Sequence, residues 1–347
     1  MNRLKNAVVI TLALAVTSLA LWKQLGRNPP VVEIRIDGQI FGSTYSLVTY
    51  GTNKTPRSKL KELVEQRLHE IDSSMSTWDK TSELTRINQG PILQPLPISS
   101  DLSVVLREAM RLSEMTDGIY DVTVGPLVKL WGFGPTGPRP EPSATEVQDA
   151  KAKVGFRNLK YTNSSVTKTK EGMSIDLSSK APGYAADQVG ALLAKIGFTN
   201  YLVEVGGEVV VKGKSPNGGL WSIGIETPTD NVETNSTLFG VMQVESGAVS
   251  TSGTYHRFRT TGKRKTHHII DPRTGEPADS GVVSVTVTAP TCTEADGLGT
   301  ALLIMGEERG LAWIAAHPRY QALFLVKTAN GFAQRMSPGF EKFLVQK

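Results

Sequence analysis

The chain has 347 residues, which is long enough for one large or two ordinary domains with a substantial core, and its net charge is +5. Arg3, Lys5, Lys23 and Arg27 supply four of these charges, so the rest of the chain is almost neutral, and no basic run carries interleaved aromatic residues. These features argue against nucleic-acid binding, and the single cysteine, Cys292, rules out an intrachain disulfide.

The first 28 residues are typical of an export segment. Two positive residues precede sixteen uncharged residues, 7–22, a length that suits a secretion signal and is marginal for a membrane span. Residues 18–20, Ser-Leu-Ala, are a candidate cleavage site, but the bulky Leu-Trp pair after them suits cleavage poorly, so a retained anchor is an alternative. The other alternative is a buried helix of the fold. We therefore expect a signal peptide or membrane anchor over 1–28 and a domain over 29–347, at the periplasmic face of the inner membrane, anchored or released.

Hydrophobic periodicity predicts helices and strands in irregular order. Helices are expected over 56–72, 101–116, 143–154, 185–196, 293–306 and 307–316. Strands are expected over 31–37, 45–50, 166–169, 173–177, 201–205, 209–212, 221–226, 238–244, 255–259, 267–270 and 284–288, with a closing hairpin over 320–335. Gly206-Gly207 predicts a tight hairpin turn, and residues 251–253, Thr-Ser-Gly, predict another. Without regular βαβ alternation, an α+β fold is expected: a single large domain of mixed sheets and packed helices, divided at most into two lobes.

The stretch 284–306 carries the clearest chemical signal. Asp296 and Thr300 are four residues apart on the expected helix, so a carboxylate and a hydroxyl lie on one face, and hard cations such as Mg²⁺ favour oxygen ligands. Gly297 and Gly299 flank the pair, and each costs roughly 1 kcal/mol in a helix relative to Ala, so something bulky should approach the backbone there. Alternatively, Thr293 caps the helix, and Asp296, at its third position, only satisfies the cap and the helix dipole.

The segment 267–275, His-His-Ile-Ile-Asp-Pro-Arg-Thr-Gly, allows two interpretations. His268 leads out of a short apolar strand, and an imidazole of ordinary pKa can accept the proton of a hydroxyl. Asp271 is a catalytic candidate beside it, or the cap of a type I turn. His268 is alternatively a structural histidine.

Nine short motifs occur in an order that resembles the ApbE family of FAD:protein FMN transferases. They are Phe-Gly-Ser-Thr-Tyr (41–45), Met-Ser-Thr-Trp (75–78), Ser-Glu-Leu with Asn88 (82–88), Asp-Val-Thr-Val-Gly-Pro-Leu (121–127), the segment 176–187, Gly-Gly-Glu (206–208), Thr-Ser-Gly (251–253), His-Ile-Ile-Asp-Pro (268–272), and Glu-Ala-Asp with Thr300 (294–300). The resemblance covers about residues 38–335, and it implies an exported enzyme.

The resemblance also implies a reaction and a metal. FAD is the substrate, FMN is attached through a phosphoester to a Ser or Thr of an acceptor protein, a membrane redox subunit, and AMP leaves. Mg²⁺ is expected on the Asp296 carboxylate, the Thr300 hydroxyl and the Ala181 carbonyl. Two alternatives remain: a periplasmic FAD pyrophosphatase that releases FMN and AMP, and a non-catalytic FAD-binding scavenger.

Flavin contacts are implied at the positions that match the family motifs. Trp78 stands where a tyrosine usually stacks on the flavin, and Phe41 replaces a frequent methionine. The family's Ala-Lys-Gly-Tyr appears here with Pro182 in place of the lysine, so Lys180 is a candidate for the lost phosphate contact. The implied cofactor-binding residues are Phe41, Trp78, Asp121, Val122, Thr123, Ser178, Lys180, Tyr184 and Ile270.

Overall fold

The computed structural model describes residues 32–51, 53–229, 237–255, 257–261, 264–329 and 331–345. The expected signal or anchor, residues 1–28, lies outside them and stays a prediction. Within the described ranges, no helix combines the length and apolar character that crossing a bilayer requires.

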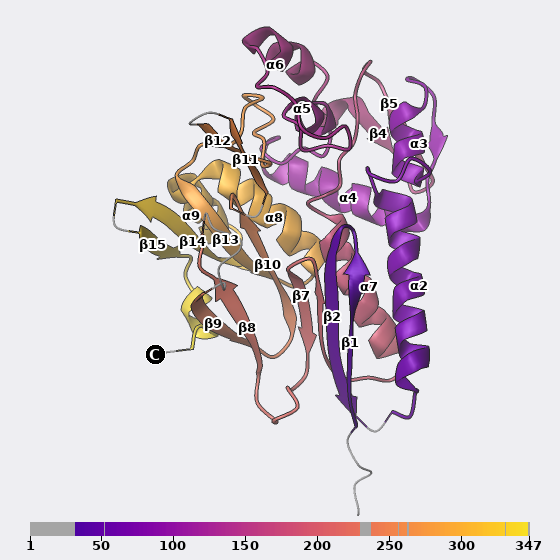
Figure 1. Cartoon of the computed structure of the whole chain (residues 1–347), viewed down its shortest axis with the longest axis vertical. Coiled ribbons are helices and arrows are strands. Elements are labelled where there is room, and N and C mark those ends of the chain that lie inside the picture. Colours follow the sequence, from indigo (N-terminus) through magenta and orange to yellow (C-terminus); the bar gives the residue numbers. More distant parts are fainter. Residues whose placement is uncertain are drawn as a thin grey trace, which may run out of the picture.

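The elements alternate irregularly along the chain, as Figure 1 shows. The helices are α2 (Arg57–Met75), α3 (Glu83–Gln89), α4 (Ser100–Met115), α5 (Gly125–Leu130), α6 (Ala144–Lys151), α7 (Ala181–Lys195), α8 (Cys292–Met305) and α9 (Glu307–Ala315), with short 3₁₀ turns η1 (Phe156–Asn158) and η2 (Phe340–Phe343). The strands are β1 (Val32–Ile40), β2 (Ser43–Gly51), β3 (Leu96–Pro97), β4 (Leu159–Tyr161), β5 (Ser165–Lys168), β6 (Asn200–Val205), β7 (Glu208–Lys212), β8 (Trp221–Glu226), β9 (Leu238–Val244), β10 (Gly247–Gly253), β11 (Phe258–Thr261), β12 (Arg264–His267), β13 (Val282–Ala289), β14 (Gln321–Thr328) and β15 (Gly331–Met336).

An antiparallel sheet forms the body of the domain. Its strand order is β1-β2-β6-β7-β10-β13-β14-β15. Helices α2, α7 and α8 pack on one face of this sheet, and a large apolar core lies between the two layers. On the other face, a second core joins the sheet to the β8–β9 hairpin and η2. Strand β13 is therefore buried over most of its length, as is the middle of β14, whereas β6 alternates between buried and half-buried residues.

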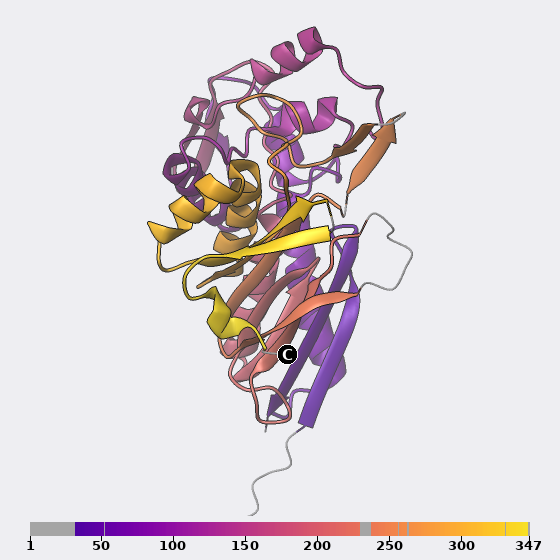
Figure 2. The same cartoon turned by 90° about the vertical axis from the view of Figure 1, so that its left-hand side faces the viewer.

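The segment from α3 to β5 lies beyond one end of the sheet, together with the β11–β12 hairpin (Figures 1 and 2). A third apolar cluster holds part of this segment together: Leu127, Leu130, Trp131, Val147, Ala150, Val154 and Ile270. This arrangement places the segment 119–128, which runs into α5, and the loop 268–272 near the turns that join β1 to β2 and β6 to β7. The expected α+β single domain is confirmed.

The amphipathic helices agree with the sequence prediction. The helix expected over 56–72 is α2, with Leu60, Val64, Leu68 and Ile71 buried along one stripe. The helix expected over 101–116 is α4, whose cap Ser99 accepts a hydrogen bond from the Leu102 amide. The expected turn at Gly206-Gly207 joins β6 to β7, and both glycines have positive φ, 62° and 95°.

Several predicted boundaries are wrong. The helix expected over 185–196 begins earlier, at Ala181, and Pro182 fits its first turn, where no amide hydrogen is needed. The strands expected over 255–259 and 267–270 are β11 and β12, each displaced by about three residues. Residues 251–253, expected to form a turn, end strand β10 and pair with residues 284–286 of β13.

The strand expected over 173–177 does not form a ladder. Met173, Ile175 and Leu177 are buried in alternation, as a strand pattern requires, but only an isolated bridge joins Ser174 to Val124. The side chain of Asn88 replaces the missing neighbour, since it accepts from the Ile175 amide at 2.7 Å and donates to the Ile175 carbonyl at 2.8 Å.

Candidate active site

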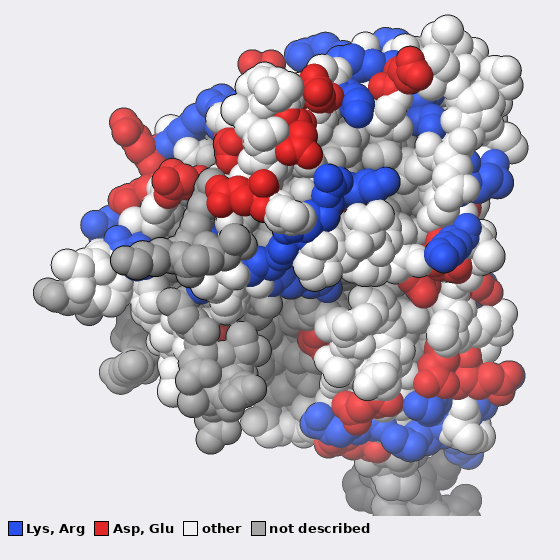
Figure 3. Space-filling model, turned by 45° about the horizontal axis from the view of Figure 1, so that its top comes forward, with Lys and Arg blue, Asp and Glu red and all other residues white. Residues whose placement is uncertain are grey.

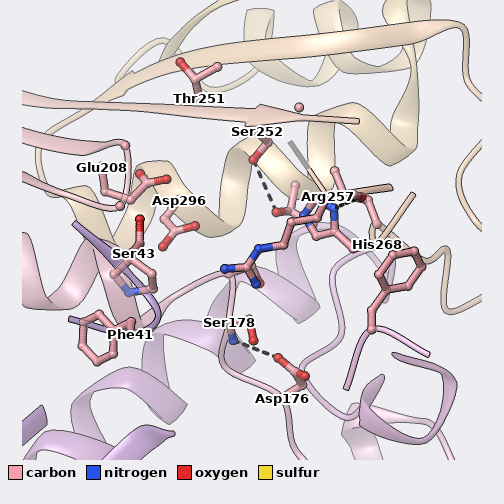
Figure 4. A pocket seen from close by; sticks show the side chains of 18 of the residues that line it. Phe41, Ser43, Asp176, Ser178, Glu208, Thr251, Ser252, Arg257, His268 and Asp296 are labelled. Carbon is pink, nitrogen blue, oxygen red and sulfur yellow. Dashed lines mark hydrogen bonds between the residues drawn. The ribbon is translucent and has the colours of Figure 1, made fainter. Parts of the chain in front are cut away.

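A cleft of about 750 Å³ opens between the end of the main sheet and the segment above it. It is lined by the β1–β2 turn, the 119–128 loop, residues 176–182, the β6–β7 turn, strands β8 and β10, the 268–272 loop and helix α8. Figure 4 shows side chains from these segments pointing into one space. This volume lies within the range of ordinary small-molecule sites.

The N-termini of α7 and α8 are joined at the floor of this cleft by reciprocal carboxylate contacts. Asp187 of α7 accepts hydrogen bonds from the Cys292 and Thr293 amides at 2.8 Å each. In return, Asp296 of α8 accepts from the Gly183 amide of α7 at 3.1 Å. Each carboxylate thus satisfies free amide groups at the start of the other helix.

This arrangement corrects the expected capping role of Asp296. Helix α8 begins at Cys292 and its N-cap is Thr291, whose hydroxyl accepts from the Glu294 amide. Asp296 therefore lies in the second turn, too far along the helix to cap it. Thr300 follows one turn later, and both residues line the cleft. The Thr300 hydroxyl is 3.4 Å from that of Ser252 on β10.

Two glycines of α8 leave space in which other segments of the chain pack closely against the helix. A Cβ on Gly297 would lie 2.5 Å from the Cε atom of Lys180, and one on Gly299 would lie 2.7 Å from the Ser252 hydroxyl oxygen. The expected close approach to the helix is therefore made by a lysine and by strand β10. It lets the Asp296 and Thr300 side chains remain between α7 and β10.

Lys180 lies beneath the cleft rather than in it. Its side chain is 1% exposed, and its ammonium donates to the Thr293 carbonyl at 2.7 Å, within 5.5 Å of the Tyr120 ring centre. Burial lowers the pKa of Lys180, and the nearby positive charge partly offsets the burial that raises the pKa of Asp296. The expected phosphate contact of Lys180 does not fit this position.

A second buried carboxylate, Glu208, faces the cleft at the start of β7 (Figure 4). Burial raises its pKa well above the ordinary value, and the charge of Asp296 adds to the shift. Cys292 donates to Glu208 through its thiol at 3.8 Å. Two buried carboxylates at one cleft floor make a positive ion favourable there, since such an ion offsets the cost of burying their charges.

Replacing Glu208 with Gln is expected to change how stability depends on pH. The folded-state pKa of Glu208 lies above its unfolded value, so the unfolded chain releases this proton first as the pH rises from about 4.5. From there, Glu208 lowers the free energy of unfolding of the wild-type domain by roughly 1.4 kcal/mol per pH unit, until it ionises in the folded state. The variant lacks this contribution. Urea unfolding between pH 5 and 8 in a chelator measures the difference.

The matched control is Glu62→Gln, on the exposed side of α2, which should leave the wild-type pH profile unchanged. Parallel profiles for the wild type and the Glu208 variant would show that the burial of Glu208 carries no such cost.

His268 lines the other side of the cleft, edge-on to Phe133 with 6.2 Å between ring centres. Its Nδ1 atom lies 3.0 Å from the Arg257 carbonyl oxygen. A carbonyl oxygen can only accept a hydrogen bond, so Nδ1 carries the proton of the neutral ring and Nε2 is the basic atom. The structure therefore defines the tautomer that a proton acceptor needs.

Asp271 has the capping role that the turn sequence allows. Its carboxylate accepts from the Arg273 amide at 2.8 Å and pairs with the Arg273 guanidinium at 2.7 Å, and its carbonyl accepts from the Gly275 amide. Asp271 does not line the cleft. The expectation that it is catalytic does not fit this position, because both carboxylate oxygens are used within the turn.

Four of the implied flavin contacts line the cleft. Phe41, with the unusual φ of 55°, forms the β1–β2 turn with Gly42, a conformation that costs on the order of 1 kcal/mol for a non-glycine residue. Ser178 and Ile270 lie on loops that face the cleft. Asp121 lines it too, but its carboxylate is occupied by the amides of Thr123 and Phe156.

The other implied flavin contacts lie elsewhere. Trp78 is 58% exposed in the loop after α2, outside the cleft lining, so stacking on a ligand in this cleft does not fit its position. Val122 and Thr123 are buried and do not line the cleft. The Tyr184 hydroxyl donates to Asp101 at 2.7 Å inside the protein. Ala181 is buried at the start of α7, and the Gly183–Asp296 bond holds that helical turn against α8.

Glu208, Ser252 and Arg257 also line the cleft. The first two belong to motifs that carry the family resemblance, but none of the three was assigned an individual role from the sequence. The signal for Glu208 was available, because it is a carboxylate that opens the otherwise apolar strand Val-Val-Val after a glycine turn. Ser252 was not singled out because the tripeptide Thr-Ser-Gly is typical of turns. Nothing local distinguishes Arg257 from the other arginines.

A metal ion in this cleft would depend on mixed oxygen donors. Among the described residues, no three His, Cys, Asp or Glu side chains come together as a metal site. Asp296 supplies a buried carboxylate, Thr300 and Ser252 supply hydroxyls, and Glu208 supplies a second carboxylate nearby. These hard donors fit Mg²⁺, which is usually bound by one or two carboxylates together with substrate phosphates and water.

The fold and the site define an α+β enzyme whose nucleotide-sized cleft has buried carboxylates at its floor. The ApbE family model matches residues 41–324. The FAD:protein FMN transferase of Vibrio cholerae is 38% identical over 322 residues, covering 92% of this chain and 95% of that protein. The protein of the same name from Haemophilus influenzae is 36% identical over 348 residues, covering 98% of each. The chain therefore belongs to the ApbE family and is a transferase, as the motif order predicted.

Solved structures agree with this assignment. Flavin transferase ApbE from Vibrio cholerae matches with a TM-score of 0.82 at 38% identity, covering 91% of this chain and 100% of that one. The apo form of Pseudomonas stutzeri flavinyl transferase ApbE matches with a TM-score of 0.81 at 31% identity, covering 90% and 97%.

Proposed function

We propose that this chain transfers FMN from FAD to a Ser or Thr hydroxyl of an acceptor protein, releases AMP and depends on Mg²⁺. The observation that carries the proposal is the meeting of Asp296, Thr300 and His268 around one cleft, although they come from a helix and a distant loop. Relatives that match nearly the whole chain are named FAD:protein FMN transferases.

The metal would be held by the Asp296 carboxylate and the Thr300 hydroxyl, with the Ala181 carbonyl as the remaining family-implied donor. Bound there, Mg²⁺ would neutralise charge on the diphosphate and orient it. The protein's contribution is positional: the Gly183 amide fixes one oxygen of Asp296, and the α7–α8 contact fixes the helix that carries both side chains. Glu208 lines the same cleft, and its carboxylate would add to the attraction for a cation once it is ionised.

His268 has the proton-transfer role. Its Nε2 atom accepts the proton of the acceptor hydroxyl while that oxygen forms a bond to the phosphorus on the FMN side. The bond from this phosphorus to the bridging oxygen breaks, and its electron pair leaves with AMP. Phosphoryl transfer needs positioning and charge compensation more than covalent help from the protein, and this cleft offers both.

We further propose that the reaction takes place at the periplasmic face of the inner membrane, with residues 1–28 as the signal or anchor. A membrane redox subunit is the acceptor that fits this location. The uncharged run 7–22 supports the proposal.

The test is to incubate a protein lacking residues 1–28 with FAD, Mg²⁺ and a redox-subunit acceptor, and to follow covalent flavin fluorescence in a denaturing gel. Labelling that requires the acceptor's Ser or Thr supports transfer. Release of FMN and AMP without labelling would identify a pyrophosphatase instead, and tight FAD binding without turnover would identify a scavenger.

A further inference from the structure

Acidic side chains dominate the charged lining of the cleft. The carboxylates that line it are Asp121, Asp176, Glu204, Glu208, Glu226 and Asp296. Arg257 is the only lysine or arginine among the described residues of this lining. Charges of both signs are mixed over the outer face in Figure 3, so the local side chains set the electrostatic environment of a bound anion.

Arg257 lies in the connection between β10 and β11, and its main chain is bound to the His268 segment. The Arg257 carbonyl accepts from the His268 amide at 3.2 Å as well as from the His268 ring at 3.0 Å. Figure 4 shows the Arg257 side chain extending from this point into the cleft, toward the side where Asp296 and Ser43 lie. Its backbone is therefore held while its charged end reaches the ligand space.

The Arg257 guanidinium differs from that of Arg259 in its partners within the described part of the protein. Across the ranges that the structure describes, it makes no hydrogen bond or ion pair with another side chain or carbonyl. Arg259, two residues further, is the contrast: its guanidinium donates to the Trp131 carbonyl at 3.0 Å and to the Arg139 carbonyl at 2.6 Å. Arg259 supports the fold, whereas the charge of Arg257 remains available to a ligand.

We propose that Arg257 binds the diphosphate of the dinucleotide substrate, in the same cleft as Asp296, the carboxylate that would hold the metal. This inference rests on the proposed function. A diphosphate carries about two negative charges, and a cleft lined by carboxylates would repel it without compensating cations. A guanidinium presents two parallel donors that match the oxygens of a phosphate. Arg257 is thus assigned as a substrate-binding residue that selects for the phosphates rather than for the flavin ring.

The test compares Arg257→Gln with the wild-type protein by fluorescence titration, using FAD, ADP and riboflavin as separate probes with Mg²⁺ present. FAD and ADP should bind about 10- to 100-fold more weakly to the variant, the range expected for a lost charged hydrogen bond. Riboflavin has no phosphate, so its affinity should not change. Arg257→Lys should give an intermediate loss, because it retains the charge but not the two-pronged geometry.

Lys265→Gln is the control, since it removes a positive charge from the neighbouring β12 strand, where the ammonium lies over the Phe258 ring at 3.8 Å and outside the cleft lining. It should leave all three affinities unchanged. Unchanged FAD and ADP affinities in Arg257→Gln, or an equal loss for riboflavin, would overturn the inference. Because these assays need no acceptor, a protein that binds as expected but labels nothing would refute transfer and leave the role of Arg257 standing.

Discussion

Replacing Asp296 with Asn is expected to reduce flavin transfer about 10³-fold and to remove the Mg²⁺ dependence of the remaining activity. The variant keeps an oxygen that can accept from the Gly183 amide, so the α7–α8 contact should survive. It lacks the negative charge that a divalent cation needs, and loss of the metal removes several kcal/mol of transition-state stabilisation. Gel labelling measures transfer, and thermal unfolding with and without Mg²⁺ measures ion binding.

Asp279→Asn is the matched control, because Asp279 is an exposed carboxylate on the loop after the His268 segment and does not line the cleft. It should retain wild-type labelling and the same rise in melting temperature with Mg²⁺. An Asp296→Asn protein that transfers flavin normally, or that is still stabilised by Mg²⁺, would contradict the metal assignment.

Replacing His268 with Gln is expected to lower the rate of transfer by about 10²- to 10⁴-fold, the usual contribution of a general base. The glutamine amide can still donate toward the Arg257 carbonyl, so the loop should keep its position. What is lost is the basic Nε2 atom. FAD affinity should therefore stay close to the wild-type value while single-turnover labelling slows, and stopped-time gels with saturating FAD separate the two effects.

His317 offers a control with the same local bonding. Its Nδ1 atom lies 2.7 Å from the Trp313 carbonyl, and its ring stacks on Trp313 with 3.8 Å between centres, away from the cleft lining. His317→Gln should label the acceptor at the wild-type rate. If His268→Gln loses FAD affinity in proportion to its rate, the histidine acts in binding and not in proton transfer.

The positions of single side chains depended on contacts between distant segments. Lys180 lies two residues before the position at which the family has a lysine, yet its ammonium turns into the protein, where the Thr293 carbonyl accepts from it and Gly297 leaves space for its side chain. Trp78 has an apolar ring that suggests stacking, but its loop lies outside the cleft. The carboxylates of Asp271 and Asp121 accept hydrogen bonds from backbone amides two residues further along the chain. The contacts of Asp271 and of Asp121 with Arg273 and Thr123 are local, whereas the directions of Lys180 and Trp78 depend on distant segments.

The sequence by itself determined the family, the amphipathic helices α2 and α4 and the placement of Asp296 and Thr300 on one face of α8, because motif order, helical periodicity and i, i+4 spacing are local properties. Only the tertiary structure decided which oxygens meet in the cleft. Residues 251–253 became a strand because β13, more than thirty residues away, supplies their hydrogen bonds. Glu208 and Arg257 gained their roles through burial and proximity, and both depend on chain segments that meet only after folding.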